Sequence, residues 1–169
     1  ARDIPPLAPT GTPCLTFAVR RLVLPLLFVL TLAGCGKDPG LAFTDTRAGG
    51  DLDVYAYQIS PSGQFLWGPN GVTLSNDSNF EANPVIAEMT DGSFVFAWTR
   101  SITGGGRLGV QKLDANGVPQ FGPNGIEVTG VGNESPGSAS IVAVPNGGYI
   151  LSWLRDVTAF LSPRHLYTQ

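Results

Sequence analysis

Side chains that could perform acid–base or nucleophilic chemistry are few and scattered in this sequence. His165 is the only histidine, and no nucleophile motif accompanies it. A Ser-His-Asp system needs the imidazole beside a nucleophile, so the sequence does not favour catalysis at His165. Carboxylates that could ligate Ca²⁺ gather before the first predicted strand, near Arg47: they are Asp45, Asp51 and Asp53.

The corresponding stretch of the second half of the chain, around Gly106 and Arg107, carries no matching acids. We therefore interpret the acidic cluster as a solvated loop, and we read Asp77, Glu81 and Glu134 in the same way. The sequence predicts no catalytic residue, no metal site and no cofactor.

Aromatic residues are the remaining candidates for a binding site. Tyr55, Tyr57 and Trp67 could stack on sugar rings, and packing between structural units is the alternative for all three. Trp98 and Trp153 end two predicted strands at an offset of 55 residues. Aromatics that recur at equivalent repeat positions usually belong to a core, so we predict that both tryptophans are buried.

The composition restricts the class of partner. The chain has a formal net charge of −3 and no block of Lys and Arg, which argues against nucleic acid as a partner. Its two cysteines, Cys14 and Cys35, lie before the repeated region, so neither a disulfide framework nor a zinc spacing is available.

The N-terminal region has the pattern of an export signal. Residues 1–18 are interpreted as a non-native or disordered leader. Two arginines, an apolar run over 22–32 and small residues before Cys35 then follow. This order is typical of a secretory signal, and an apolar run of 11 residues is too short to cross a membrane. We assign a signal peptide to 19–34 and a polar tether to 35–41.

The sequence Leu-Ala-Gly-Cys at residues 32–35 resembles the lipobox of bacterial lipoproteins at all four positions. The resemblance implies cleavage before Cys35, acylation of that residue and a membrane anchor through it. Gly36 rather than Asp follows the cysteine, which in that family favours the outer membrane or cell surface. The expected localisation is therefore exported and lipid-anchored.

The rest of the chain, residues 42–169, contains a repeat. Gly-Pro-Asn-Gly occurs at 68–71 and again 54 residues later at 122–125, each time after an aromatic and before a β-branched residue. The main copies are 54–107 and 108–162, with partial copies at both ends. The predicted anchors of the repeat are Gly68, Gly71, Trp98, Gly122, Gly125 and Trp153.

Each copy predicts several short strands. Apolar residues alternate over 54–59 and 108–113, as half-buried strands require. Asp-Gly and Asn-Gly in the predicted hairpins, 84–99 and 140–154, favour type I′ turns with two residues at positive φ. The remaining predicted strands are 64–67, 118–121, 72–74 and 126–128.

The repeat resembles the secreted β-propeller repeats, loosely kelch-like, of large bacterial surface proteins. The resemblance rests on the period, the Trp-Gly-x-x-Gly-Val motif and the strand-ending tryptophans, and it covers roughly residues 43–169. It implies an all-β fold of consecutive four-stranded antiparallel blade-like units, an incomplete propeller, preceded by an N-terminal apolar signal helix.

These features favour a non-enzymatic cell-surface lipoprotein with a binding or scaffold role, as a fragment of a longer repeat protein. The expected partners are the membrane, through lipidated Cys35, and a protein or carbohydrate. Enzymatic activity stays open: the alternative is the N-terminal part of a propeller glycan hydrolase or lyase whose catalytic residues lie in missing blades. A further alternative is a fragment with no function of its own.

Overall fold

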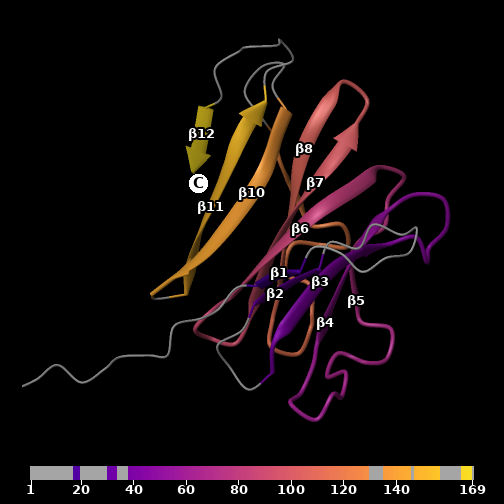
Figure 1. Cartoon of the computed structure of the whole chain (residues 1–169), viewed down its shortest axis with the longest axis vertical. Helices are drawn as coiled ribbons and strands as arrows, with labels where there is room; N and C mark the ends of the chain where they lie inside the picture. Colours follow the sequence, from indigo (N-terminus) through magenta and orange to yellow (C-terminus); the bar gives the residue numbers. More distant parts are fainter. Residues whose placement is uncertain are drawn as a thin grey trace, which may run out of the picture.

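The fold is built from three antiparallel β-sheets, which Figure 1 shows side by side. The computed structural model describes residues 17–19, 30–33, 38–129, 135–145, 147–156 and 165–168. The first sheet contains β1 (Phe17–Val19), β2 (Leu30–Ala33), β3 (Gly40–Asp45), β4 (Asp53–Gln58) and β5 (Val72–Ser75). The second sheet contains β6 (Phe80–Glu88), β7 (Phe94–Ile102), β8 (Gly105–Leu113) and β9 (Ile126–Val128). The third sheet contains β10 (Ser135–Val144), β11 (Gly148–Asp156) and β12 (His165–Thr168).

The predicted all-β class is confirmed, and none of the three sheets closes on itself in the described residues. Most of the predicted signal helix over 19–34 lies outside the described residues; Val19 and Leu30–Ala33 belong to strands β1 and β2. β3 begins at Gly40, inside the predicted tether. No helix in the described part of the chain is long and apolar enough to span a membrane.

The hairpin between β6 and β7 forms as predicted, but its turn type differs. Gly92 N donates to Met89 O at 3.0 Å, and Met89 N donates to Ser93 O at 2.8 Å. Gly92 has a φ of +79°, whereas Asp91 does not adopt a positive φ. The prediction of a type I′ turn is therefore wrong here: a three-residue loop with one left-handed glycine joins the strands. The turns at 60–64 and 114–118 make the same pair of hydrogen bonds.

Two bulges interrupt β6 and β10 at equivalent positions. The pairing of β6 with β7 shifts between Ala82 and Val85, and that of β10 with β11 shifts between Gly137 and Ser140. Asn83 and Ser138, 55 positions apart, have φ of +54° and +49° and are the non-glycine residues with positive φ among those described. The bulge is thus a repeated feature that bends each strand in the same place.

The two Gly-Pro-Asn-Gly loops have matching backbones. All four glycines have positive φ, between +67° and +90°: Gly68, Gly71, Gly122 and Gly125. A Cβ at Gly71 would lie 2.5 Å from the carbonyl oxygen of Ala56, and one at Gly125 would overlap the carbonyl oxygen of Val110. The second glycine of each loop is therefore required twice, by its φ and by the close approach of a strand.

The predicted short strands at 64–67 and 118–121 do not form. These segments make only single bridges, Ile59 with Phe65 and Leu113 with Pro119. Each segment instead folds back as a loop, since Leu66 N and Gln120 N donate to carbonyl oxygens of β4 and β8.

Two apolar cores hold the sheets together, one at each interface. Alternation along β7 divides its side chains, so that Phe94, Phe96 and Trp98 face the first sheet while Val95 and Ala97 face the third. The first core joins these aromatics to Ala42, Val54, Ala56, Leu74, Ile86 and Leu113. The second core comprises Met89, Val95, Ala97, Leu108, Val110, Leu151 and Trp153.

Candidate functional site

Trp67 lies where the turn region of the first sheet meets the turn at 114–118 of the second sheet. Its indole Nε1 donates to the carbonyl oxygen of Ala115 at 3.3 Å. Its ring meets that of Phe94 edge to face at 5.5 Å. Gly117 leaves room for the indole, because a Cβ there would lie 2.7 Å from the ring. Trp67 is thus half-buried between two structural units.

A pocket of about 490 Å³ opens beside Trp67 between these turns. Its described lining is mostly polar and consists of Asp38, Gln58, Leu66, Trp67, Glu88, Gly92, Ala115 and Asn116. Three separate stretches of chain contribute: the entry to β3, the end of β4 with its following loop, and the turns of the second sheet. This pocket, which we call the Trp67 pocket, is the candidate binding site.

The polar groups of the Trp67 pocket are held by local hydrogen bonds. Gln58 Nε2 donates to the carbonyl oxygen of Asp38 at 3.2 Å, which leaves its amide oxygen as an acceptor. Asn116 is exposed, and its hydrogen bond to Asp114 Oδ1, at 2.8 Å, uses only its backbone N–H. Donors and acceptors are therefore both present on the lining, with carboxylates added by two acidic residues.

Lys112 and Asp91 lie close to the turns that form the pocket. Lys112 Nζ is 3.7 Å from Asp91 Oδ2. Hydrogen bonds from the Ser93 hydroxyl and backbone lower the pKa of Asp91, so this carboxylate stays charged at neutral pH. The ion pair balances one lysine against one acid and leaves the pocket acidic.

Tyr55 and Tyr57 lie on the opposite face of the first sheet from Trp67. They alternate along β4 with Val54 and Ala56, which belong to the first core. The structure therefore does not bring the three predicted stacking residues into one site.

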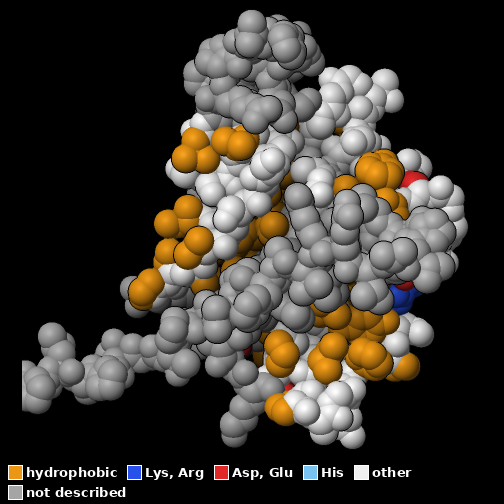
Figure 2. All heavy atoms as spheres, viewed as in Figure 1, with side chains coloured by type: hydrophobic (Ala, Val, Ile, Leu, Met, Phe, Trp, Pro, Cys, Tyr) orange, Lys and Arg blue, Asp and Glu red, His pale blue; other side chains and the backbone are white. Residues whose placement is uncertain are grey.

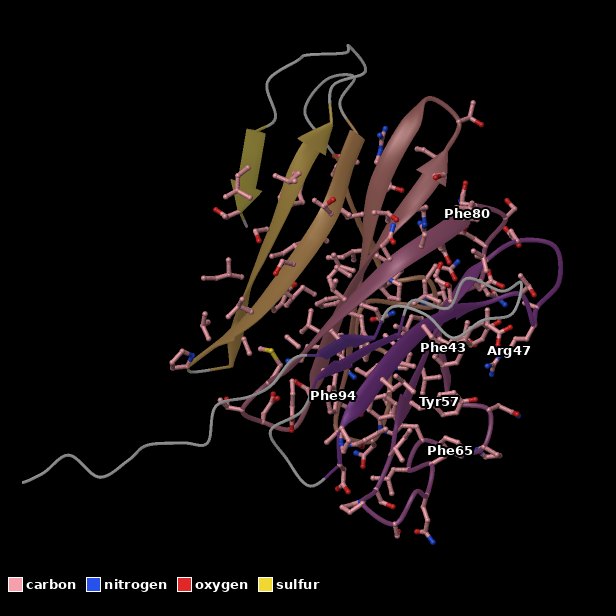
Figure 3. The ribbon with its side chains drawn as sticks, in the orientation of Figure 1. Phe43, Arg47, Tyr57, Phe65, Phe80 and Phe94 are labelled. Carbon is pink, nitrogen blue, oxygen red and sulfur yellow. The ribbon has the colours of Figure 1, made fainter. Side chains whose placement is uncertain are left out.

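The two tyrosines form an aromatic face with Phe43, Phe65 and Arg47, labelled in part in Figure 3. The rings of Phe43 and Tyr57 stack in parallel at 5.6 Å, and Tyr57 meets Phe65 at 4.8 Å. The Arg47 guanidinium lies 4.3 Å from the Tyr55 ring centroid. Figure 2 shows hydrophobic side chains gathered near a basic patch in this part of the surface.

This aromatic face serves to fix the first Gly-Pro-Asn-Gly loop. Arg47 Nη1 donates to the carbonyl oxygen of Asn70 at 3.0 Å, and Tyr57 Oη donates to that of Pro69 at 3.3 Å. In the second copy the buried Gln111, at the position equivalent to Tyr57, donates to the carbonyl oxygen of Gly122 at 2.6 Å. Tyr57 and Gln111 thus perform the same structural task with different chemistry.

A buried polar cluster around Arg100 escaped the sequence interpretation. Arg100 Nε lies 3.1 Å from Glu81 Oε1, and its Nη2 donates to Ser75 Oγ at 2.8 Å. Asp77 Oδ2 lies 3.0 Å from the same Nη2. Glu81 is fully buried. The prediction that Asp77 and Glu81 lie in a solvated loop is wrong for Glu81, because β6 extends back to Phe80 and carries it between two sheets.

Two acids in this region are poorly solvated. Burial raises the pKa of Glu81, although hydrogen bonds from Ser75 and Arg100 act in the opposite sense. Asp53 is 1% exposed, and neither carboxylate oxygen has a hydrogen-bond partner in the described structure. Burial, together with nearby Asp51, Asp77 and Asp45, raises its pKa. Asp53 was also predicted to be solvated, and the structure corrects this, since it opens the buried strand β4.

The acidic cluster does not form a cation site in the described residues. Asp45 pairs with Arg47 at 2.7 Å, whereas Asp53 is buried away from solvent. No group of three His, Cys, Asp or Glu side chains with metal-binding geometry occurs among the residues described.

The remaining predicted residues lie as follows. Trp98 is completely buried in the first core, and Trp153 is 7% exposed in the second. The backbone of His165 opens β12. Cys35, with the lipidation predicted for it, and Glu134 lie outside the described residues.

Comparison with known proteins gave no match to a family model, to a curated protein or to a solved structure. The candidate site is therefore argued from its own geometry.

Proposed function

We propose that this chain is a non-enzymatic, lipid-anchored cell-surface protein with a binding or scaffold role, built from propeller-like repeats. The observation that carries the proposal is the repeated sheet interface. Trp98 of the second sheet packs back onto the first sheet, and Trp153 of the third sheet packs back onto the second. Units that bury their faces on their neighbours are the basis of repeat architectures.

The strand arrangement supports blade-like units. β6, β7, β8 and β9 form one four-stranded antiparallel meander, and β10, β11 and β12 repeat its first three strands. β6, the first strand of its meander, lies beside both β3 and β10 in Figure 1. Adjacent first strands and a sheet that extends outward from them are features of propeller blades.

A surface role is supported by the sequence around Cys35 and by the Trp67 pocket. The Leu-Ala-Gly-Cys motif would place the chain on a membrane through acyl groups on Cys35. Asp38, which lines the pocket, follows Cys35 closely in the chain, so the anchor would hold the pocket near the lipid surface.

The anchor is tested by Cys35→Ser in the full chain, with Cys14→Ser as the matched control. We expect Cys35→Ser to abolish fatty-acid labelling and to release the protein from the membrane fraction, and Cys14→Ser to change neither. Equal labelling of the parent and Cys35→Ser would contradict the proposal.

A further inference from the structure

The Trp67 pocket has the size of a small-molecule site but not the usual lining. Its volume of about 490 Å³ lies within the range of about 300–1,000 Å³ found for ligand pockets. Most such pockets are lined by apolar side chains, with few polar groups. Here two carboxylates and two amides surround one indole. A ligand that matched this lining would be polar over most of its surface.

The charge of the lining excludes anionic ligands. Asp38 and Glu88 both contribute, and the described lining contains no Lys or Arg. Lys112, close to the turns, is already paired with Asp91. An anionic ligand would therefore meet like charges without compensation.

The hydrogen-bonding groups favour hydroxyls over ammonium groups. Asn116 offers both a donor and an acceptor, and Gln58 keeps its amide oxygen as an acceptor. An ammonium ion only donates, so it would leave the amide N–H groups of the pocket without partners. A sugar hydroxyl donates and accepts, and it can use both kinds of group.

Trp67 adds an apolar surface at one wall. It is held between Phe94 and Gly117 by packing and by its hydrogen bond to Ala115. Its position therefore does not have to be fixed by the ligand. A rigid indole beside carboxylates and amides suits a ring that is apolar on its C–H face and polar at its rim.

We infer that the Trp67 pocket binds a neutral carbohydrate. This inference deepens the proposed binding role and rests on it. The ligand class is a neutral glycan segment, whose hydroxyls meet Asp38, Glu88 and Asn116 while a sugar ring contacts Trp67.

Tryptophan fluorescence of the full chain provides the test. Trp98 is fully buried and Trp153 nearly so, which leaves Trp67 as the indole a ligand can reach. The probes are neutral trimers of α-1,4-glucose, β-1,4-glucose and β-1,4-N-acetylglucosamine, with a galacturonic acid trimer and spermidine for comparison. We expect a saturable emission change with at least one neutral trimer, and none with the acidic trimer or spermidine.

Two variants sharpen the test. Trp67→Phe retains an aromatic ring and should remove the emission change. Asn116→Ala should weaken binding about fivefold through a lost hydrogen bond. Asn70→Ala, at an exposed turn asparagine outside the pocket lining, is the matched control and should bind as the parent does.

Three results would overturn the inference. They are silence from every neutral trimer up to about 10 mM, the weak end of specific binding, unchanged binding by Asn116→Ala, and preference for the acidic trimer or spermidine. Membrane attachment through Cys35 is measured independently, so failure of the sugar assay alone would leave the proposed anchor intact.

Discussion

The two interfaces between sheets share their apolar plan and differ in their charged edge. In both, a tryptophan on the second strand of a sheet packs back against smaller side chains of the preceding sheet. The first interface adds Arg100, paired with the buried Glu81. In the next copy, Arg155 stands 55 positions after Arg100, but Pro136 replaces the acid at the position of Glu81.

This difference separates what the repeat needs from what one interface adds. Apolar packing with a tight glycine opposite or beside it occurs at both interfaces. The ion pair does not, because its acid has no counterpart in the second copy. We therefore expect the apolar contacts to dominate stability and the ion pair to matter only locally.

The largest effect is expected from Trp98→Ala. Removal of a fully buried tryptophan typically costs about 3–5 kcal/mol in the free energy of unfolding. Trp153 is 7% exposed and its sheet has three described strands, so Trp153→Ala should cost less. Urea unfolding of both variants in the full chain measures the order. A Trp98→Ala variant that unfolds like the parent would remove the basis of the comparison.

The second effect is expected from Arg100→Met, which leaves Glu81 buried without its partner. Breaking a buried ion pair from one side costs about 3 kcal/mol or more, since the remaining charge stays desolvated. The double variant with Glu81→Gln should recover part of this loss. Arg155→Met is the sequence-matched control and should cost less. Equal losses at Arg100 and Arg155 in thermal unfolding would show that the two edges are alike.

A smaller effect separates the two glycines of one loop. Gly68→Ala meets open space and is strained only by its positive φ, at a cost of about 1 kcal/mol. Gly71→Ala must also displace the carbonyl of Ala56, so it should cost more. Gly125→Ala and Gly122→Ala should repeat this order in the second loop. The reverse order in chemical denaturation would contradict the equivalence of the loops.

The smallest effect concerns pH. The folded state raises the pKa of Asp53, chiefly by burial, so it holds the proton more tightly than the unfolded chain does. Charged Asp53 therefore destabilises the fold at neutral pH, and this cost is relieved as pH falls through the raised pKa. Asp53→Asn should raise Tm at pH 7 and flatten the rise on mild acidification. A lower Tm at pH 7 would mean that the charge has a stabilising partner.

Local chemistry explains how much of this fold the sequence could predict. The repeat, the hairpins and the left-handed glycines follow from period-two alternation and from the φ that only glycine adopts freely. Such signals act within a few residues. They indicate that strands and turns exist, which is why the all-β class could be predicted. They failed at 64–67 and 118–121, where backbone hydrogen bonds to a strand favour a loop.

The candidate site was only partly accessible for the same reason. Trp67 was identified by its type, yet its partner Ala115 lies 48 residues away on another sheet. Tyr57 was grouped with it, although alternation along β4 puts the two on opposite faces. A signal for this separation existed in the alternation itself.

By itself, the sequence determined the repeat, the strand pattern and the glycine turns, because each depends on neighbouring residues and backbone conformation. Only the tertiary structure decided which face of each strand is buried and which charges meet. Glu81 and Arg100 are 19 residues apart, and they pair because β6 and β7 bring them side by side against the first sheet. Burial then alters their energetics, since removal of water strengthens an ion pair and penalises an unpaired acid such as Asp53.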